Sequence, residues 1–155
     1  MKKILKRYDK PGKWEVVIPF EKVGEEIEWV GILDAREAGE YELRVVADHR
    51  VVQTKGRITV KAVAGARAHV KITGMIKIYK AAQETDDFLE LRVLTLDKSA
   101  RAVAEPELEI EANNVRASHA ASVGQVDKEQ MLYLMSRGMS REQAQEQIVN
   151  GWLGV

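Results

Sequence analysis

The chain has 155 residues, enough for one domain with a hydrophobic core, and a division into two full domains is not expected. Its 24 basic and 24 acidic side chains cancel, so no charge excess points to nucleic acid or to an anionic membrane. The absence of cysteine excludes disulfides, thiol nucleophiles and cysteine-ligated metal centres supplied by this chain alone. We expect a cytoplasmic protein, because the sequence shows neither an export signal nor a membrane-spanning run of about 20 apolar residues.

The segment from Trp14 to Ile110 has the pattern of β-structure. Short runs rich in Val, Ile, Leu and Tyr follow one another, and apolar residues often alternate with polar ones, as at Ile58, Val60 and Ala62. The predicted strands are residues 14–20, 26–35, 41–49, 56–63, 66–79, 87–97 and 107–112. Breaks are expected at Gly24, Gly39, Gly56, Gly65, Gly74 and Pro106.

Many short strands at regular spacing are compatible with a sandwich, a barrel or a β-solenoid. Small residues at the corners, as in KAVAGARAHVKITG (61–74), favour the solenoid, in which the inward apolar positions of one coil continue into the next. Periodicity alone leaves the sandwich as the default.

From Asp127 onward the pattern is helical. Asp127 is the expected N-cap of a first helix, with Gln130 placed to reach back, and Gly138 is its expected left-handed stop. Ser140 and Gln143 predict a capping box for a second helix, whose regular pattern should end at Gly151. The apolar stripes of this helical hairpin are Met131, Leu132, Leu134 and Met135 in the first helix and Ala144, Ile148 and Trp152 in the second. We therefore predict a β-domain over residues 1–126 and a helical hairpin over residues 127–155.

The segment VRASHAASVGQVDKEQMLYLMSRGMSREQAQEQIVNGW (115–152) closely resembles the C-terminal motif of the SufB/SufD proteins of iron–sulfur cluster assembly. The resemblance continues upstream through AAQETDDFLELRVLTLDKSARAVAEPELEIEANNV (81–115) and VKITGMIKI (70–78). It implies a right-handed parallel β-helix followed by the two helices. It also implies a non-catalytic scaffold or accessory subunit that works with a SufC-type ABC ATPase, and that forms a homodimer or a heterodimer with a SufB/SufD-type protein through the β-helix.

The resemblance also suggests His119 as a candidate ligand of an iron–sulfur cluster. Imidazole can ligate cluster iron. One histidine cannot hold a cluster, so any cluster would be transient and shared with another subunit. The alternative is that His119 hydrogen-bonds the backbone where the β-domain meets the helices. Leu91 stands where SufB-like members carry the sulfur-accepting cysteine. Ala120 stands where the family has Gly or Glu, and it would be strained if that glycine has a positive φ.

Other polar candidates are expected to be structural. His49 and His69 lie in strand-like runs without the spacing of a metal-binding pair, so we interpret them as surface residues or as histidines satisfied by hydrogen bonds. The acidic segment Glu84–Asp87 is predicted to be a solvated turn between coils. No phosphate-binding loop follows Gly12, and Ser118 and His119 are strand neighbours on opposite faces, so no enzyme is expected.

The two helices carry the main predicted interface. Their apolar stripes should first cover the end of the β-domain, because an uncovered solenoid exposes unpaired strand edges. The remaining exposed residues should then dock the ATPase, and methionines suit such adaptable surfaces. The candidate docking residues are Tyr133, Met135, Arg137, Met139, Ile148 and Trp152. The alternative is a structural interaction or self-assembly module that has lost cluster chemistry.

Overall fold

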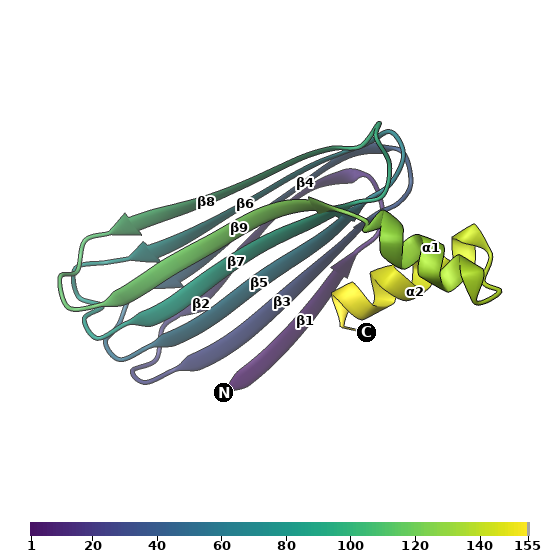
Figure 1. Cartoon of the computed structure of the whole chain (residues 1–155). Helices are drawn as coiled ribbons and strands as arrows, with labels where there is room; N and C mark the ends of the chain where they lie inside the picture. Colours follow the sequence, from purple (N-terminus) through teal and green to yellow (C-terminus); the bar gives the residue numbers. More distant parts are fainter. Residues whose placement is uncertain (155) are drawn as a thin grey trace.

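In the computed structural model, which describes residues 1–154, the chain winds into a parallel β-solenoid that ends in two helices (Figure 1). Sheet A contains β1 (Lys2–Tyr8), β3 (Glu26–Ala35), β5 (Lys55–Ala64), β7 (Asp86–Thr95) and β9 (Arg116–Gln125). Sheet B contains β2 (Gly12–Phe20), β4 (Gly39–His49), β6 (Ala68–Ile78) and β8 (Arg101–Ile110). The helices are α1 (Lys128–Ser136) and α2 (Arg141–Leu153).

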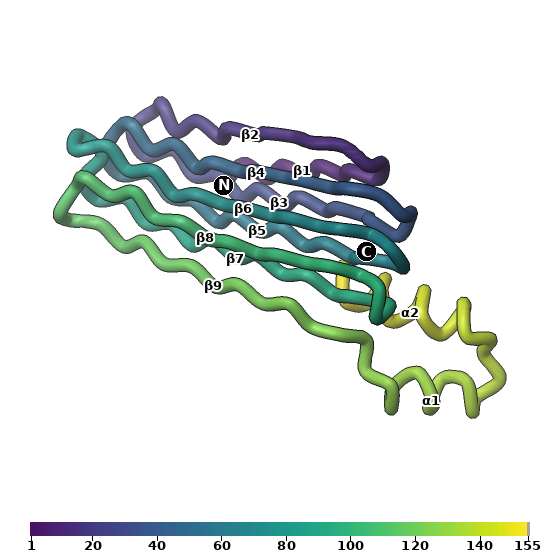
Figure 2. The backbone as a smooth tube through the Cα atoms, turned by 90° about the horizontal axis from the view of Figure 1, so that it is seen from above, coloured from purple at the N-terminus to yellow at the C-terminus, as the bar shows by residue number. Residues whose placement is uncertain are grey.

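Successive strands alternate between the two sheets, and each strand pairs in parallel with the strand two further along the chain (Figure 2). One full turn takes roughly 30 residues, within the range of solenoid repeats. The predicted solenoid is confirmed, and the sandwich favoured by periodicity alone is wrong. The division into domains 1–126 and 127–155 stays a prediction, and Val155 lies outside the described residues.

Two expected breaks lie inside strands. Gly74 is in the middle of β6, where an added Cβ would lie 2.8 Å from the side chain of Leu89 on the opposite sheet. Close packing between the sheets therefore requires a glycine there. Pro106 is in β8, whose only strand neighbour in sheet B is β6. A proline without an N–H is tolerated in such an edge strand. The strands β1 and β9 and the first half of β8 were not among the predicted strands.

The core of the solenoid is built from columns of inward side chains. Paired positions on β3, β5 and β7 place Trp29, Ile58 and Leu89 above one another, and each is at most 2% exposed. The second sheet has a matching column of Leu43 and Ile72, both fully buried. Each coil thus adds one residue to each column, which is why the alternating pattern recurs once per turn.

The helical caps largely follow the sequence. Asp127 accepts a hydrogen bond from the backbone N–H of Glu129 (2.8 Å), and Gly138 has the expected positive φ of 96°. Ser140 and Gln143 form the predicted capping box. The prediction that Gly151 ends the helix is wrong, because α2 continues to Leu153 and closes on Gly154 with a φ of 78°.

The expected packing of the helices over the end of the solenoid is also wrong. Instead, α2 lies against the outer face of sheet A, where its buried Val149 and Leu153 contact Ile32, Val63 and Leu94. These three residues make an apolar patch on the outside of β3, β5 and β7, and its burial favours the lateral position. Helix α1 contacts α2 and buries none of its residues.

Polar contacts hold the middle and the C-terminal end of α2 on sheet A. The Nζ of Lys61 on β5 donates to the carbonyl oxygens of Trp152 (3.2 Å) and Leu153 (3.4 Å), a favourable place for a cation. Near the middle of the helix, Arg36 joins Glu146 of α2 to Asp34 of β3. The hydrogen bond from the Arg36 guanidinium holds the pKa of Asp34 below its usual range.

Candidate functional site

His119 continues a column of the hydrophobic core. It pairs with Leu89 of β7, which pairs in turn with Ile58, so the imidazole takes the inward position of the last coil. Leu89 and Ile58 are buried, whereas His119 is exposed, because β9 is the last strand of sheet A and no further coil covers it. The histidine therefore lies in the open end of the solenoid.

Apolar side chains surround this open end. Leu108 and Ile110 of β8 continue the buried columns of Ile76 and Ile78, yet each is 40% exposed. On β9, Val123 is 51% exposed. Within residues 1–154, β8 and β9 each have one edge without a strand partner. An end with apolar columns and unpaired strand edges can add strands or another copy of the fold.

Leu91 and Ala120, the two other residues that the resemblance singled out, both lie in strands of sheet A. Leu91 is fully buried in the core and pairs with Ala121 of β9. Ala120 lies within β9 opposite Glu90 and is not among the residues of positive φ, so the expected strain at Ala120 is absent.

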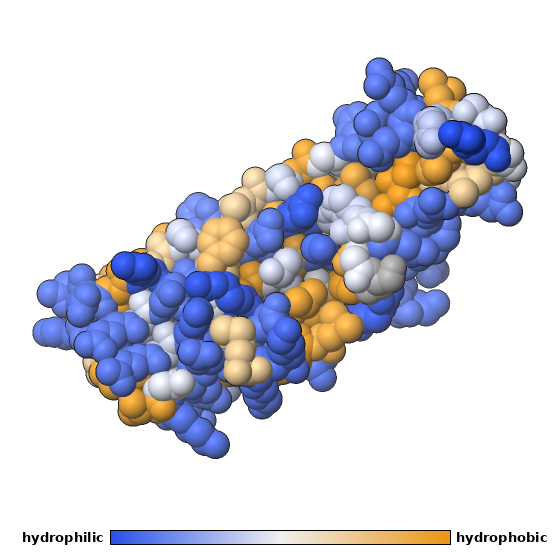
Figure 3. All heavy atoms as spheres, turned by 60° about the horizontal axis from the view of Figure 1, so that its bottom comes forward, coloured by the Kyte–Doolittle hydropathy of each residue, from blue (hydrophilic) through white to orange (hydrophobic). Residues whose placement is uncertain are grey.

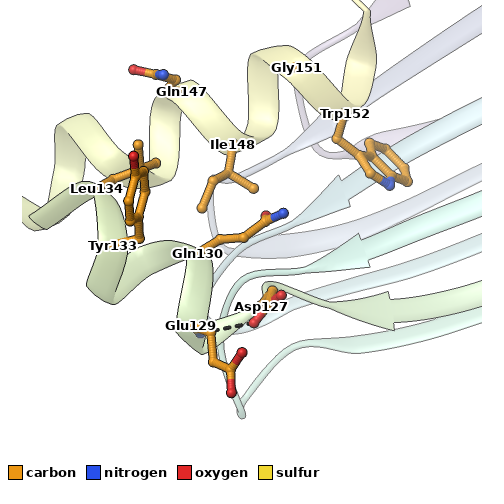
Figure 4. Close-up of a pocket in the computed structure, with 9 residues that line it drawn as sticks. All are labelled: Asp127, Glu129, Gln130, Tyr133, Leu134, Gln147, Ile148, Gly151 and Trp152. Carbon is orange, nitrogen blue, oxygen red and sulfur yellow. Dashed lines mark hydrogen bonds between the residues drawn. The ribbon is translucent and has the colours of Figure 1, made fainter.

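A second candidate site is a groove between the two helices. It has a volume of about 680 Å³, with Tyr133 and Leu134 on the α1 side and Ile148 and Trp152 on the α2 side (Figure 4). Its other lining residues are Asp127, Glu129, Gln130, Gln147 and Gly151. In Figure 3 apolar atoms of the hairpin are visible at the surface among hydrophilic ones.

The structure brings only half of the predicted docking residues together. Tyr133, Ile148 and Trp152 line the groove, and Met135, Met139 and Arg137 do not. The guanidinium of Arg137 instead lies 5.2 Å from the ring centre of Tyr133 and donates to its hydroxyl (3.1 Å). Three of the lining residues that were missed stand three or four residues from a predicted one on the same helix: Glu129, Gln130 and Gly151.

A buried polar network lies inside the solenoid. Thr85 donates to the carbonyl oxygen of Ala82 (2.9 Å), and its hydroxyl oxygen lies 3.2 Å from that of Thr54. His49 joins this pair to Asp87, because its Nδ1 lies 2.7 Å from Thr54 Oγ1 and its Nε2 lies 2.7 Å from Asp87 Oδ2. Both His49 and Asp87 are fully buried, and Asp87 Oδ1 has no hydrogen-bond partner within residues 1–154.

This network corrects one prediction and supports another. The segment Glu84–Asp87 is not a solvated turn throughout, because Thr85 and Asp87 are each 1% exposed. His49 is a satisfied core histidine, stacked on Phe20 with 4.0 Å between ring centres. His69 lies at the surface, 2.8 Å from Glu40. Within residues 1–154 no three His, Asp or Glu side chains are placed to hold a metal ion.

A parallel β-solenoid with a lateral helical hairpin defines the structural class, and sequence comparison gives the family. The sequence of residues 15–152 matches the protein-family model 'SUF system FeS cluster assembly, SufBD core domain'. The chain therefore belongs to this family. A SufBD family protein of iron-sulfur cluster assembly from Mycobacterium leprae is 34% identical over 145 residues, 88% of this chain and 37% of that protein.

Two relatives carry the name SufD. The iron-sulfur cluster assembly protein SufD of Bacillus subtilis is 45% identical over 80 residues, 52% of this chain and 18% of that protein. The SufD protein of Escherichia coli is 35% identical over 89 residues, 57% of this chain and 21% of that protein. The chain thus spans well under half the length of these relatives. Neither helix in the described part of the chain is long and apolar enough to cross a membrane.

Proposed function

We propose that the chain is a non-catalytic scaffold or accessory subunit of iron–sulfur cluster assembly that pairs with a SufB/SufD-type protein. The observation that carries the proposal is His119, a core position left open to solvent at the end of the solenoid. A second solenoid placed against β8 and β9 would cover the exposed apolar columns and bring its own ligands to the imidazole. The transient cluster is then cargo held between two subunits.

The cluster role is tested by anaerobic reconstitution with iron and sulfide, with and without a SufB/SufD-type partner. We expect the charge-transfer absorption of a cluster in the mixture and its loss in His119→Ala. The matched control is His69→Ala, since His69 is exposed on the other sheet. A colourless wild-type mixture, or equal cluster content in both variants, would show that His119 is structural.

The subunit pairing is tested separately by molar mass in solution. Val123→Lys places a charge in the exposed inward column of the last coil without replacing a buried side chain. We expect it to abolish homodimers or heterodimers, because a cation buried at an apolar interface is left without a partner. A dimer of unchanged affinity would place the pairing surface elsewhere.

A SufC-type ABC ATPase is proposed as the partner of the helical hairpin. The groove has a partly exposed apolar lining. Its α2 side is held in place, because α2 packs on sheet A and the ring centre of Trp152 lies 5.2 Å from the guanidinium carbon of Arg92 and 5.9 Å from Nζ of Lys61. Partly exposed aromatic and aliphatic residues in a groove are typical of interaction sites.

Gly151 offers a way to block this groove without damaging the fold. A Cβ added at Gly151 meets no atom within 4 Å, so a side chain there would extend into open space. Gly151→Leu also removes a helix-interior glycine, which stabilises a helix by up to about 1 kcal/mol. We expect equal or higher thermal stability together with loss of ATPase binding at micromolar concentrations. Retained binding would exclude the groove.

The alternative function is a structural or self-assembly module without cluster chemistry. It is favoured by the absence of cysteine and by Leu91, which fills the core with an inert side chain. In that case the chain would form dimers but take up no cluster, with or without a partner subunit.

A further inference from the structure

The charged residues that line the hairpin groove are all acidic. Asp127 and Glu129, at the start of α1, line the groove, whereas no lysine or arginine does (Figure 4). One oxygen of Asp127 accepts the Glu129 N–H, and neither carboxylate forms an ion pair within residues 1–154. The groove therefore has an acidic rim whose carboxylates have no ion-pair partner within residues 1–154.

The remaining polar groups of the groove do not offset this charge. Gln130 and Gln147 carry neutral amides, and neither side chain has a hydrogen-bond partner in the described part of the chain. Lys61 and Arg92 lie against Trp152, but they line the neighbouring surface of sheet A and not the groove. The amides are available to a partner's backbone, and the carboxylates are available to a cation.

The part of the groove between the two helices is apolar. Leu134, Ile148 and Trp152 are half-buried, and Tyr133 is 58% exposed. These apolar groups lie between the two helices, next to the acidic rim (Figure 4). An occupant that fills the apolar part must therefore also cover or approach the carboxylates. A carboxylate that loses water without gaining a partner opposes binding.

We propose that the groove receives a partner segment that presents a large apolar side chain beside a lysine or arginine, with the cation paired to Glu129. The inference rests on the proposed docking of a partner at the hairpin and adds the chemistry of the docked segment. An acidic segment fits less well, because the carboxylates of the rim would repel it. A purely apolar segment fits less well, because it would leave those carboxylates without a cation to pair with.

Charge reversal tests this proposal with a matched control on the second helix. Glu129 and Glu142 are the acidic first-turn residues of α1 and α2, both exposed, so reversal disturbs the two helix dipoles alike. Only Glu129 lines the groove. The probe is the SufC-type ATPase of the same organism, with its dissociation constant measured for wild type, Glu129→Lys, Glu142→Lys and Ile148→Asp at two salt concentrations.

We expect Glu129→Lys to weaken binding about tenfold and to flatten its salt dependence, whereas Glu142→Lys changes binding less than about twofold. Loss of binding in Ile148→Asp with no effect of Glu129→Lys overturns the basic-segment proposal and leaves the docking site standing. If all variants bind as wild type does, the docking surface lies elsewhere and both proposals are wrong. If wild type does not bind at micromolar concentrations, the ATPase partnership and the inference that rests on it fail together.

Discussion

Removal of the Asp87 carboxylate should destabilise the solenoid strongly. His49 and Asp87 are 0% and 1% exposed, so water cannot replace the 2.7 Å hydrogen bond between Nε2 and Oδ2. Breaking a buried pair by deleting one partner costs about 3–5 kcal/mol, because the other partner stays buried and unpaired. We expect Asp87→Ala to lower the free energy of unfolding by that amount.

Replacing both partners should recover part of this loss. In His49→Phe the ring can still stack on Phe20, and it needs no hydrogen bond. Thr54 keeps its contact with Thr85 in the double variant. We expect His49→Phe combined with Asp87→Ala to be about 1–3 kcal/mol more stable than Asp87→Ala alone, since no uncompensated polar atom of the pair remains.

The assay is urea unfolding followed by far-UV circular dichroism and by the fluorescence of the tryptophans, of which Trp29 is in the core. Asp86→Ala is the control, because Asp86 is half-exposed and pairs with Arg57 at 3.3 Å, a surface contact worth about 0–1 kcal/mol. If Asp87→Ala costs no more than Asp86→Ala, or if the double variant shows simple additivity, the network does not stabilise the fold as argued.

Three further predictions concern local features. Gly56→Ala should cost about 1–3 kcal/mol in urea unfolding, because an added Cβ would lie 2.5 Å from the Asp87 carboxylate; an unchanged midpoint would refute the fit. Ser140→Ala should cost about 1 kcal/mol and speed amide exchange in α2 only. Arg36 lowers the pKa of Asp34 in the folded state, so Asp34 stabilises the fold at pH values above its unfolded pKa of about 3.9. This stabilisation is lost as the pH falls through the pKa of Asp34 in the folded state. Acid titration of Asp34→Asn should therefore lose less stability than wild type.

The contrast between the two ends of the solenoid bears on how the fold avoids aggregation. The first strand carries Lys2, Lys3 and Lys6, and lysines on an edge strand discourage pairing with other chains. Tyr8 and Trp14 contact each other there, with 5.2 Å between ring centres. Apart from His119, the inward residues of β9 are small or apolar. Because β8 also carries Pro106, Glu105, Glu107 and Glu109, the exposed apolar columns of the last coil, and not a lack of edge charges, favour the proposed pairing surface at β8 and β9.

Local patterns were enough to predict most strands and both helices. Alternation in residues 26–35 matches β3 residue for residue, and the capping box of Ser140 and Gln143 marks the start of α2. These signals are local, since they arise from side-chain direction along a strand and from hydrogen bonds within one helical turn. Ile148 and Trp152 were predicted as part of the apolar stripe of the second helix, whereas the docking role of Tyr133, Ile148 and Trp152 came from the resemblance and stays a prediction.

Tertiary structure decided which strands pair and what each polar residue does. Alternation is the same in a sandwich and in a solenoid, so only pairing across roughly 30 residues separates the two folds. His49 and Asp87 meet from β4 and β7, and nothing in either segment signals the other. The lateral position of α2 likewise depends on an apolar patch from three separate strands. His119 is a candidate ligand by geometry because it continues the inward column of Leu89 on β9, the last strand of sheet A within the described residues, where no further strand covers it.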